Sequence, residues 1–398
     1  MKIVLLSDDY LPNSTRVHAK MLHELAIEFT GRGHKVVVIT PGCWNQDNKV
    51  IIDNIDSIEV WRFKTKPTRG VGKIKRAINE SMLSVRGHLA LKKMIDEYQF
   101  DICVNYSPTI FFGPLAWYLK RKGAYVYLIL RDFFPQWIID QGIVQEKSLI
   151  VRYFRFFEHF NYSTSDCVAV QSPANLVLFE KMYPDHENTC VLMNWTKSKP
   201  TILTDVVTKE ELGLNGKIVL FYGGNIGHAQ DMENLMRLAR NLKNHEQAHL
   251  LLIGQGDEFE LVQETILSWN LTNVTLLPSV SQDKYIRIVA GVDIGLFSLS
   301  SKHSAHNFPG KLLGYMVESL PILGSVNSGN DIIDLVNKSM SGLVSVNGDD
   351  NAFLENTLEL INDNTLRDKM GINSFNLVNE LFSVESAADN ILSQAISD

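Results

Sequence analysis

The sequence predicts an α/β protein with two doubly wound, Rossmann-like domains facing a cleft, and three observations support this fold class. The chain has 398 residues, more than one ordinary hydrophobic core accommodates. Short apolar runs alternate with segments of helical periodicity along nearly its whole length. A polar, proline-containing stretch at 194–200 interrupts the alternation and is typical of a linker. We therefore expect one domain over 1–195, a second over 196–375, and a C-terminal helix over 376–398 that returns to the first.

The alternation consists of βα units, so the strands within each half are expected to run parallel. In the first half a strand at 3–7 is followed by a helix with apolar residues at helical spacing, and then by the next strand. The tail from about residue 364 is helical. The other expected strands are at 36–40, 101–105, 125–130, 166–171 and 191–192, and in the second half at 217–222, 248–253, 273–277, 293–297, 321–324 and 342–344.

Composition and charge narrow the possible partners. Apolar residues make up 45% and charged residues 21% of the chain, as in ordinary globular proteins. There is no apolar run of the ~20 residues that a membrane span needs, and no signal peptide is expected, so we expect a cytoplasmic protein. Residues 1–195 hold 24 Lys and Arg against 20 Asp and Glu, whereas the remainder holds 14 against 25. The acidic half argues against nucleic acid, and the basic half suits an anionic membrane surface.

Small polar loops follow the strands of the second half. Gly223, Gly224, Asn225 and Gly227 follow the first of these strands, and Gly254 follows the next. Glycines let a backbone approach a ligand closely, and parallel strands bring these loops to one edge of the sheet. The pattern favours a nucleotide diphosphate site, although a plain βα turn would also explain the first loop.

Residues 303–324 are predicted to form a loop, a helix, a turn and a strand. Pro309 suits the first turn of the helix, and Lys311 then lies in the same turn. A lysine is poorly placed for the helix dipole at that end unless an anion binds there. The alternative is a solvated surface lysine.

Two polar segments of the first half also follow strands. The first runs from residue 7 to 18, and in the second Arg131 and Asp132 follow the strand at 125–130. Asp132 could orient a sugar hydroxyl or act as a base, or it could form a salt bridge or helix cap. Asp8 and Asp9 have no evident third ligand for a metal, so we interpret them as cap and turn residues.

Six ordered motifs make the chain resemble the family 4 glycosyltransferases, which have the GT-B fold. The motifs lie at 31–40, 131–135, 221–227, 251–256, 292–296 and 309–316. The chain is most similar to the WbuB-type branch, taken to transfer N-acetyl-L-fucosamine or related amino sugars in bacterial O-antigen and surface-polysaccharide assembly. The resemblance implies a metal-independent enzyme without a cofactor. It moves a sugar from a nucleotide donor such as a UDP-sugar, with retention of configuration, to an undecaprenyl-diphosphate-linked acceptor at the cytoplasmic face of the inner membrane.

The resemblance also implies residue roles. The catalytic residues would be Asp132, Asn225 and Lys311. The donor-binding residues would be Gly223, Gly224, Asn225, Gly227, Gly254, Val280, His306, Gly310, Lys311 and Glu318. The acceptor-binding residues would be Asn13, Ser14, Arg16, His18, Arg131 and Asp132.

The sequence departs from the family pattern at several positions. His306 and Gly314 stand where the family often has two glutamates. Glu318 lies one helical turn after Gly314 on the same face and is the candidate to replace the second glutamate in binding the ribose. Asn225 and His228 stand in place of the usual Arg and Lys, so phosphate neutralisation would depend on Lys311 and backbone N–H groups. The alternatives are a UDP-N-acetyl-sugar 2-epimerase of the same fold and an inactive partner subunit.

The segment 61–86 carries eight Lys and Arg and only one acid, Glu80. Its apolar residues Ile74, Ile78, Met82 and Val85 repeat at helical spacing, and Trp61 and Phe63 precede them. We expect this segment, with residues 153–157, to dock on the anionic inner leaflet. The alternative is a core-packed helix with a solvated basic face.

Overall fold

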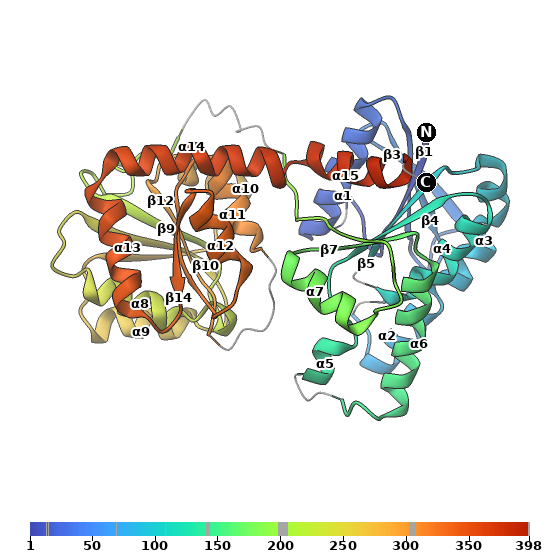
Figure 1. The fold of residues 1–398 in the computed structure, drawn as a ribbon, viewed down its shortest axis with the longest axis horizontal. Helices are drawn as coiled ribbons and strands as arrows, with labels where there is room; N and C mark the ends of the chain where they lie inside the picture. The colour runs from blue at the N-terminus through green and yellow to red at the C-terminus, as the bar shows by residue number, and fades with distance from the viewer. Residues whose placement is uncertain are drawn as a thin grey trace. The chain divides into compact units, whose positions relative to one another are not determined.

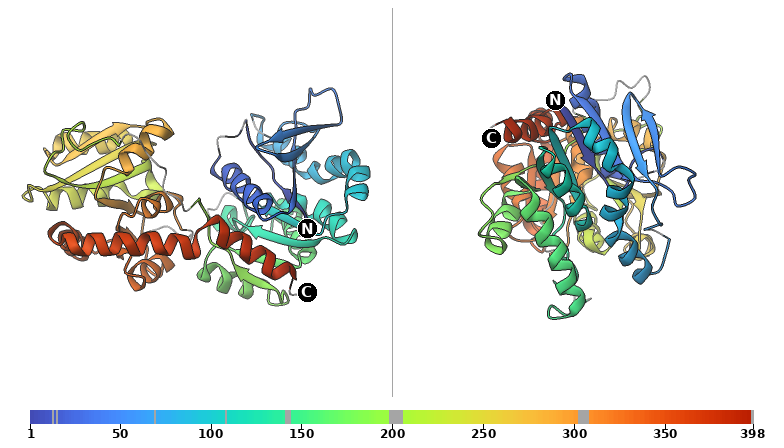
Figure 2. Two further views of the ribbon diagram at one scale, coloured as in Figure 1. Left: turned by 90° about the horizontal axis from the view of Figure 1, so that it is seen from above. Right: turned by 90° about the vertical axis from the view of Figure 1, so that its right-hand side faces the viewer.

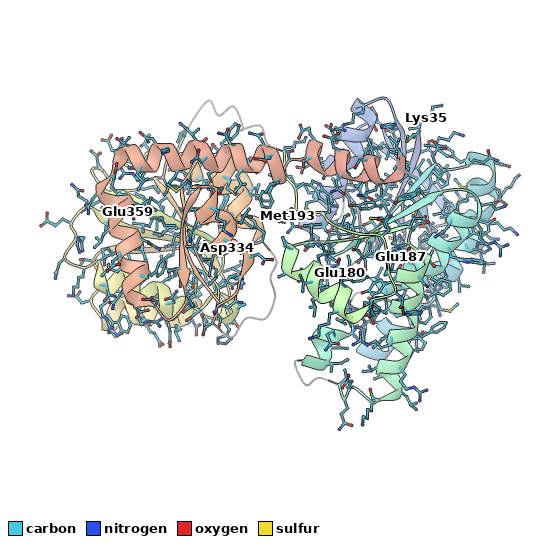
Figure 3. The ribbon with its side chains drawn as sticks, in the orientation of Figure 1. Lys35, Glu180, Glu187, Met193, Asp334 and Glu359 are labelled. Atoms are coloured by element: carbon cyan, nitrogen blue, oxygen red, sulfur yellow. The ribbon has the colours of Figure 1, made fainter. Side chains whose placement is uncertain are left out.

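The computed structural model describes residues 1–12, 14, 16–68, 70–107, 109–140, 144–197, 206–301 and 308–396 (Figure 1). The chain forms two compact units, one of Met1–Met193 with Val384–Asp398 and one of Asn194–Ser383. Met193, the last residue of the first unit before the chain enters the second unit, is labelled in Figure 3. Each unit contains a largely or wholly parallel sheet with helices along it, so the predicted class of two doubly wound α/β domains is confirmed.

The first unit holds an eight-stranded sheet in which only the β3–β4 pair is antiparallel. The central strands β1, β5, β6 and β7 are apolar runs whose side chains are buried on both faces, as expected for parallel strands that helices cover on both sides. The β3–β4 hairpin was not predicted: Trp61 and Phe63 were expected at a membrane interface, and the structure buries both in the core. The strands in spatial order are β3 (Val50–Ile55), β4 (Ile58–Phe63), β2 (Lys35–Pro41), β1 (Lys2–Leu6), β5 (Ile102–Ser107), β6 (Tyr125–Leu130), β7 (Cys167–Val170) and β8 (Thr189–Val191).

The final helix of the chain belongs to the first unit. Helix α15 (Val384–Ile396) lies beside α1 (Val17–Gly31), as Figure 1 and Figure 2 show, and Arg32 Nη2 donates a 3.0 Å hydrogen bond to the carbonyl of Glu385. The expected boundary at residue 376 falls inside α14, which stays with the second unit. The other helices of the first unit are α2 (Lys73–Ser81), α3 (Leu83–Tyr98), η1 (Ile110–Phe112), α4 (Gly113–Arg121), α5 (Gln136–Asp140), α6 (Leu149–Thr164) and α7 (Pro173–Met182).

The second unit holds a six-stranded parallel sheet with β9 near its middle. The order is β11 (Val274–Pro278), β10 (Ala248–Gln255), β9 (Ile218–Asn225), β12 (Ile294–Ser298), β13 (Ile322–Val326) and β14 (Gly342–Val346). The strand order reverses between β9 and β12, and doubly wound sheets bind ligands beyond the carboxyl ends of the strands at such a point. The helices, besides η2 (His228–Gln230), are α8 (Met232–Asn241), α9 (Phe259–Ser268), α10 (Gln282–Val289), α11 (Gly310–Val317), α12 (Asp331–Lys338), α13 (Asp350–Asn362) and α14 (Asn364–Leu381).

Capping side chains fix where several of these helices begin. The Asp231 carboxylate accepts a hydrogen bond from the N–H of Asn234 at the start of α8, and the Ser281 hydroxyl caps α10 in the same way. Asp231 has a φ of 49°, a left-handed conformation that turns the chain sharply from η2 into α8. These caps set the position of the loops at the carboxyl edge of the sheet.

Candidate functional site

A cavity of about 430 Å³ opens at the carboxyl ends of β9 and β10 in the second unit. Its walls come from β9, β10, the segment after β11, α10 and α11. The predicted residues that line it are Gly223, Gly224, Asn225, Gly254, Val280 and Lys311. The sequence analysis did not name the other polar lining residues, Gln255, Ser279, Gln282 and Tyr285. Gln255 ends β10 and Ser279 directly follows β11, so the strand-end rule could have found them, whereas Tyr285 lies inside α10 and gave no signal.

Lys311 lies in the first turn of α11, as predicted, and Pro309 lies just before that helix. The expectation of a solvent-exposed side chain was wrong. The Nζ atom is buried, has no hydrogen-bond partner among the described residues, and lies 3.7 Å from the centroid of the Tyr222 ring. Burial lowers the pKa of the Lys311 ammonium to about 7. A buried cation facing a cavity without a carboxylate nearby is suited to an anionic ligand.

Glycines allow the chain segments around this cavity to approach one another. A Cβ on Gly254 would lie 1.8 Å from the carbonyl oxygen of Gly224, so β9 and β10 meet there without room for a side chain. Gly224 itself has a φ of +124°, and a Cβ there would lie 3.6 Å from Lys311 Nζ. The Gly223 N–H donates a 2.9 Å hydrogen bond to the Tyr315 hydroxyl. The glycine segment is therefore a continuation of β9 through Asn225, and not the loop predicted after residue 222.

The polar side chains beyond β9 are engaged with one another. Asn225 Nδ2 donates a 2.7 Å hydrogen bond to Gln230 Oε1. His228 Nδ1 lies 2.5 Å from Glu258 Oε1, and its Nε2 lies 3.5 Å from Asp257 Oδ2. Two carboxylates thus lie beside the imidazole of His228, so these three side chains together offer an anion no net positive charge. Among the residues that the structure describes, Lys311 is the one lysine or arginine that lines the cavity.

Three further predicted donor residues, Gly227, Gly310 and Glu318, are not among the residues that line the cavity. Glu318 is the C-cap of α11, at the opposite end of the helix from Lys311, and burial raises the pKa of its carboxyl. Gly310 begins α11 and has open space around its Cβ position, whereas a Cβ on Gly227 would lie 2.3 Å from Asp257 Oδ1. His306 lies outside the described residues.

A second polar pocket of about 170 Å³ lies in the first unit, and Arg16 and Asp132 both line it. Its other polar residues, which the sequence analysis did not assign to a site, are Asp8, Thr68, Arg76, Glu80 and Thr109. Ser14 donates a 2.6 Å hydrogen bond from Oγ to Asp9 Oδ2. Asn13 lies outside the described residues.

His18 and Arg131 meet on a buried tyrosine. The His18 ring stacks on Tyr106 with centroids 5.7 Å apart, and the Arg131 guanidinium lies 5.6 Å from the centroid of the same ring. Asp8 links this group to Arg16, since its carboxylate lies 3.5 Å from His18 Nε2 and 3.9 Å from Arg16 Nη1. The structure thus brings four predicted residues, Arg16, His18, Arg131 and Asp132, to one region of the unit.

Asp132 is exposed at the mouth of this pocket, yet the surrounding protein still desolvates its carboxyl. Desolvation raises the pKa of Asp132, and the nearby charge of Arg131 opposes the rise only in part. The charge of Arg131, which the sequence suggested as a salt-bridge partner, therefore affects the pKa of Asp132 less than desolvation does. A carboxylate with a raised pKa is a better proton acceptor than an ordinary one.

Two family models match the chain, one for each unit. The model described as "Glycosyl transferase 4-like domain" matches residues 18–195, and the model described as "Glycosyl transferases group 1" matches residues 207–376. Together they account for most of the chain. The protein belongs to these glycosyltransferases.

Individual proteins similar to this glycosyltransferase share low sequence identity with it. The probable glycosyltransferase WbjE of Pseudomonas aeruginosa is 23% identical over 54% of this chain and 54% of its own length. The putative colanic acid biosynthesis glycosyl transferase WcaI of Escherichia coli (strain K12) is 22% identical over 71% of this chain and 73% of its own. The structure of Anabaena Alr3699/HepE in complex with UDP-glucose superposes with a TM-score of 0.68 at 15% identity, covering 100% of both chains. This last likeness concerns the fold, which is that of the GT-B glycosyltransferases.

The basic segment of the glycosyltransferase at 61–86 is not one amphipathic helix. It comprises the end of β4, then α2, and then the start of α3, with a break at Met82. Ile78, Met82 and Val85 are exposed as expected, whereas Arg76 pairs with Glu80 at 2.8 Å. The side chains of Lys73 and Ile74 lie outside the described residues. No helix in the described part of the chain is both long and apolar enough to span a bilayer.

Proposed function

We propose that this glycosyltransferase moves a sugar from a UDP-sugar bound in the cavity at β9 and β10, with retention of configuration. The observation that carries the proposal is the buried Nζ of Lys311, which faces a glycine-lined cavity and has no hydrogen-bond partner among the described residues. The UDP-glucose complex of Alr3699/HepE, which has the same fold, supports a UDP-sugar as the donor class.

The chemistry that this site supports is departure of the diphosphate from the anomeric carbon. Negative charge develops on the β-phosphate as the bond breaks, and a preorganised cation and N–H donors lower that barrier without needing a metal. Lys311 supplies the cation and the free N–H groups at the start of α11 supply donors. In this proposal Gly223, Gly224, Asn225, Gly227, Gly254, Val280 and Gly310 bind the donor, with Asn225 also acting on the transferred sugar, and His306 and Glu318 complete the donor set.

We propose further that the transferred sugar is an N-acetylated hexosamine or deoxyhexosamine, with N-acetyl-L-fucosamine as the first candidate. The acceptor is a sugar on undecaprenyl diphosphate in O-antigen or capsule assembly, at the anionic inner leaflet. The printed role of WcaI in colanic acid biosynthesis supports a surface polysaccharide as the product class. Asn13, Ser14, Arg16, His18, Arg131 and Asp132 bind the acceptor, and Asp132 orients or deprotonates the attacking hydroxyl.

A panel of UDP-sugars, assayed for UDP release with and without a lipid-linked acceptor, tests the proposal. If the protein is a transferase, one donor should release UDP only when the acceptor is present, and a glycosylated acceptor should form. Release of UDP from a UDP-N-acetyl sugar alone, together with an epimerised sugar, would instead identify a 2-epimerase. Absence of turnover with every donor, despite UDP binding, would identify an inactive partner subunit.

A further inference from the structure

Three helices of the first unit, α3, α4 and α6, expose a contiguous apolar face. A groove of about 600 Å³ runs between them, and its lining is almost wholly apolar. Large apolar residues on the rim of the groove are exposed to solvent: Leu89 is 73% accessible, Phe156 63%, Val85 46% and Trp117 42%. We call this surface the aromatic groove; it is lined by Ser84, Val85, His88, Leu89, Pro114, Trp117, Tyr118, Phe156, Phe157 and Phe160.

Helix α6 continues this apolar surface beyond the groove. Leu149, Tyr153, Phe156 and Phe160 recur at the spacing that places side chains along one helix face, and Leu149 is 80% accessible. The buried residues of α6, such as Val151 and Glu158, lie on its other side, so the outward stripe does not contribute to the core. The N-terminal end of α6 lies away from the sheet in Figure 1 and Figure 2. An exposed apolar surface that is contiguous over several helices is typical of a contact with a protein or a membrane.

The groove ends at a basic site. A second hollow shares Trp117 and Phe160 with it and adds Lys120, Arg121, Ser163 and Thr164. Lys120 is already bound to Asp166 at 2.7 Å. Arg121 is different, because it is exposed, lies 5.0 Å from the centroid of the Trp117 ring, and makes no ion pair with any described residue. An unpaired guanidinium held at the end of an apolar groove suits the phosphate of an amphiphile.

We propose that the aromatic groove binds an alkyl chain of an anionic bilayer phospholipid, with the lipid phosphate on Arg121. The exposed stripe of α6 then lies in the membrane interface, where tyrosine and tryptophan side chains are favoured. This inference rests on the proposed function. It keeps residues 153–157 of the expected docking surface, which lie on α6, and replaces the basic helix α2 with the groove between α3, α4 and α6. The ring of Phe111 lines the polar pocket that contains Asp132, and its centroid lies 5.0 Å from the ring centroid of Phe157 in the groove. A membrane docked on the groove would therefore lie beside that pocket.

Vesicles that contain a phosphatidylglycerol with a photoactivatable group in one acyl chain test the proposal on the full chain. Irradiation followed by peptide mass spectrometry should place the labels on α3, α4 and α6. Leu89→Glu and Phe156→Glu should each reduce vesicle binding by about 10-fold or more, since each removes a large apolar side chain from the interface. Val177→Glu is the matched control, because Val177 is 67% accessible on α7, outside the groove.

The charge of the lipid is tested with Arg121→Glu, which should weaken binding to anionic vesicles and abolish the preference over neutral vesicles. Lys181→Glu on α7 makes the same change of charge at an exposed position away from the groove and should have little effect. Labels confined to α2, or binding insensitive to Leu89→Glu and Phe156→Glu, would overturn the proposal. So would a lipid-free dimer that the same variants dissociate, because the occupant would then be a second copy of the chain. Labelling requires no turnover, so its result is independent of whether the proposed transfer reaction occurs.

Discussion

Lys311 Nζ lies 3.7 Å from the centroid of the Tyr222 ring, and the hydroxyl of that same tyrosine donates a hydrogen bond to the carbonyl of Asn225. One buried side chain therefore contacts both the cation on α11 and the last residue of β9. The ring face stabilises the ammonium partly, although burial without a carboxylate still disfavours its charge. An anionic ligand would supply the missing interaction, which leads to the first two predictions.

Replacing Lys311 with alanine should lower kcat by roughly 10²–10³, the size expected for losing one donor that stabilises transition-state charge. The measurement is UDP release under saturating donor and acceptor. Lys338→Ala is the control, since Lys338 lies on α12 of the same unit and forms only an exposed pair with Asp334, which is labelled in Figure 3. Near-normal activity of the Lys311 variant would show that another group neutralises the diphosphate.

Binding of UDP should be accompanied by proton uptake at about pH 8. Burial lowers the pKa of Lys311 to about 7 in the ligand-free protein, and a diphosphate beside it favours the charged form. Titration calorimetry in buffers of different ionisation enthalpy measures the uptake, and Lys311→Met should abolish it. Without ligand, the unfolded chain, with a lysine pKa near 10.4, binds more protons between about pH 7 and 10. This lysine's contribution to stability should therefore rise with pH across that window. If UDP binding to the Lys311→Met variant takes up as many protons as binding to the wild type, a group other than Lys311 accepts the proton.

Two glycine-to-alanine substitutions should have opposite effects. Gly314 lies on the exposed face of α11 with nothing within 4 Å of its Cβ position, so Gly314→Ala should stabilise the protein by about 0.5–1 kcal/mol. Gly254→Ala should destabilise it and weaken UDP binding, because its Cβ would lie 1.8 Å from the Gly224 carbonyl oxygen. Thermal unfolding and UDP titration measure both effects. Unchanged UDP affinity in Gly254→Ala would mean that β9 and β10 can separate without disturbing the cavity.

Asp132→Asn should lower kcat/KM for the acceptor by about 10²-fold or more and leave UDP affinity unchanged. Desolvation raises the pKa of this carboxyl, so wild-type activity should fall as the pH drops through a value above the ordinary ~3.9 of aspartate. That acidic limb should be absent from the asparagine variant. The exposed Asp47→Asn provides a control in the same unit. An unchanged pH profile would show that Asp132 neither accepts the proton nor orients the hydroxyl.

Activity should persist in excess EDTA, because in the proposed mechanism Lys311 and backbone N–H groups take the role that a divalent cation has in metal-dependent transferases. Within the described ranges no group of three or more His, Cys, Asp and Glu side chains is placed to hold a metal. Asp8, which the sequence analysis considered as a ligand, lies instead beside Arg16 and His18. Complete loss of activity in EDTA, restored by Mn²⁺ or Mg²⁺, would contradict this prediction.

The sequence analysis found site residues that lie at the ends of strands or at the start of a helix, and it missed residues that lie within a strand or a helix. Gly223, Gly254 and Lys311 were found because they follow strands or open a helix at the carboxyl edge. Tyr222 was assigned only to a strand, and Tyr285 gave no signal, since an aromatic residue inside an element is usually part of the core. His228 was noted only as a replacement for the family's usual lysine, and nothing in the sequence indicated that Asp257 and Glu258 lie beside its two ring nitrogens.

The sequence by itself determined the two α/β units, their mostly parallel strands and the loops at the carboxyl edges, because periodicity and glycine placement are local properties of the chain. Tertiary structure decided which side chains are buried and what faces them. It divided the basic segment among β4, α2 and α3, and it placed Trp61 and Phe63 in the core, where they join a buried cluster with Leu91 and Ile95 of α3. It also buried the Nζ of Lys311 against Tyr222, which lies 89 positions earlier in the chain. Burial and charge pairing depend on such contacts between distant residues, and no local pattern specifies them.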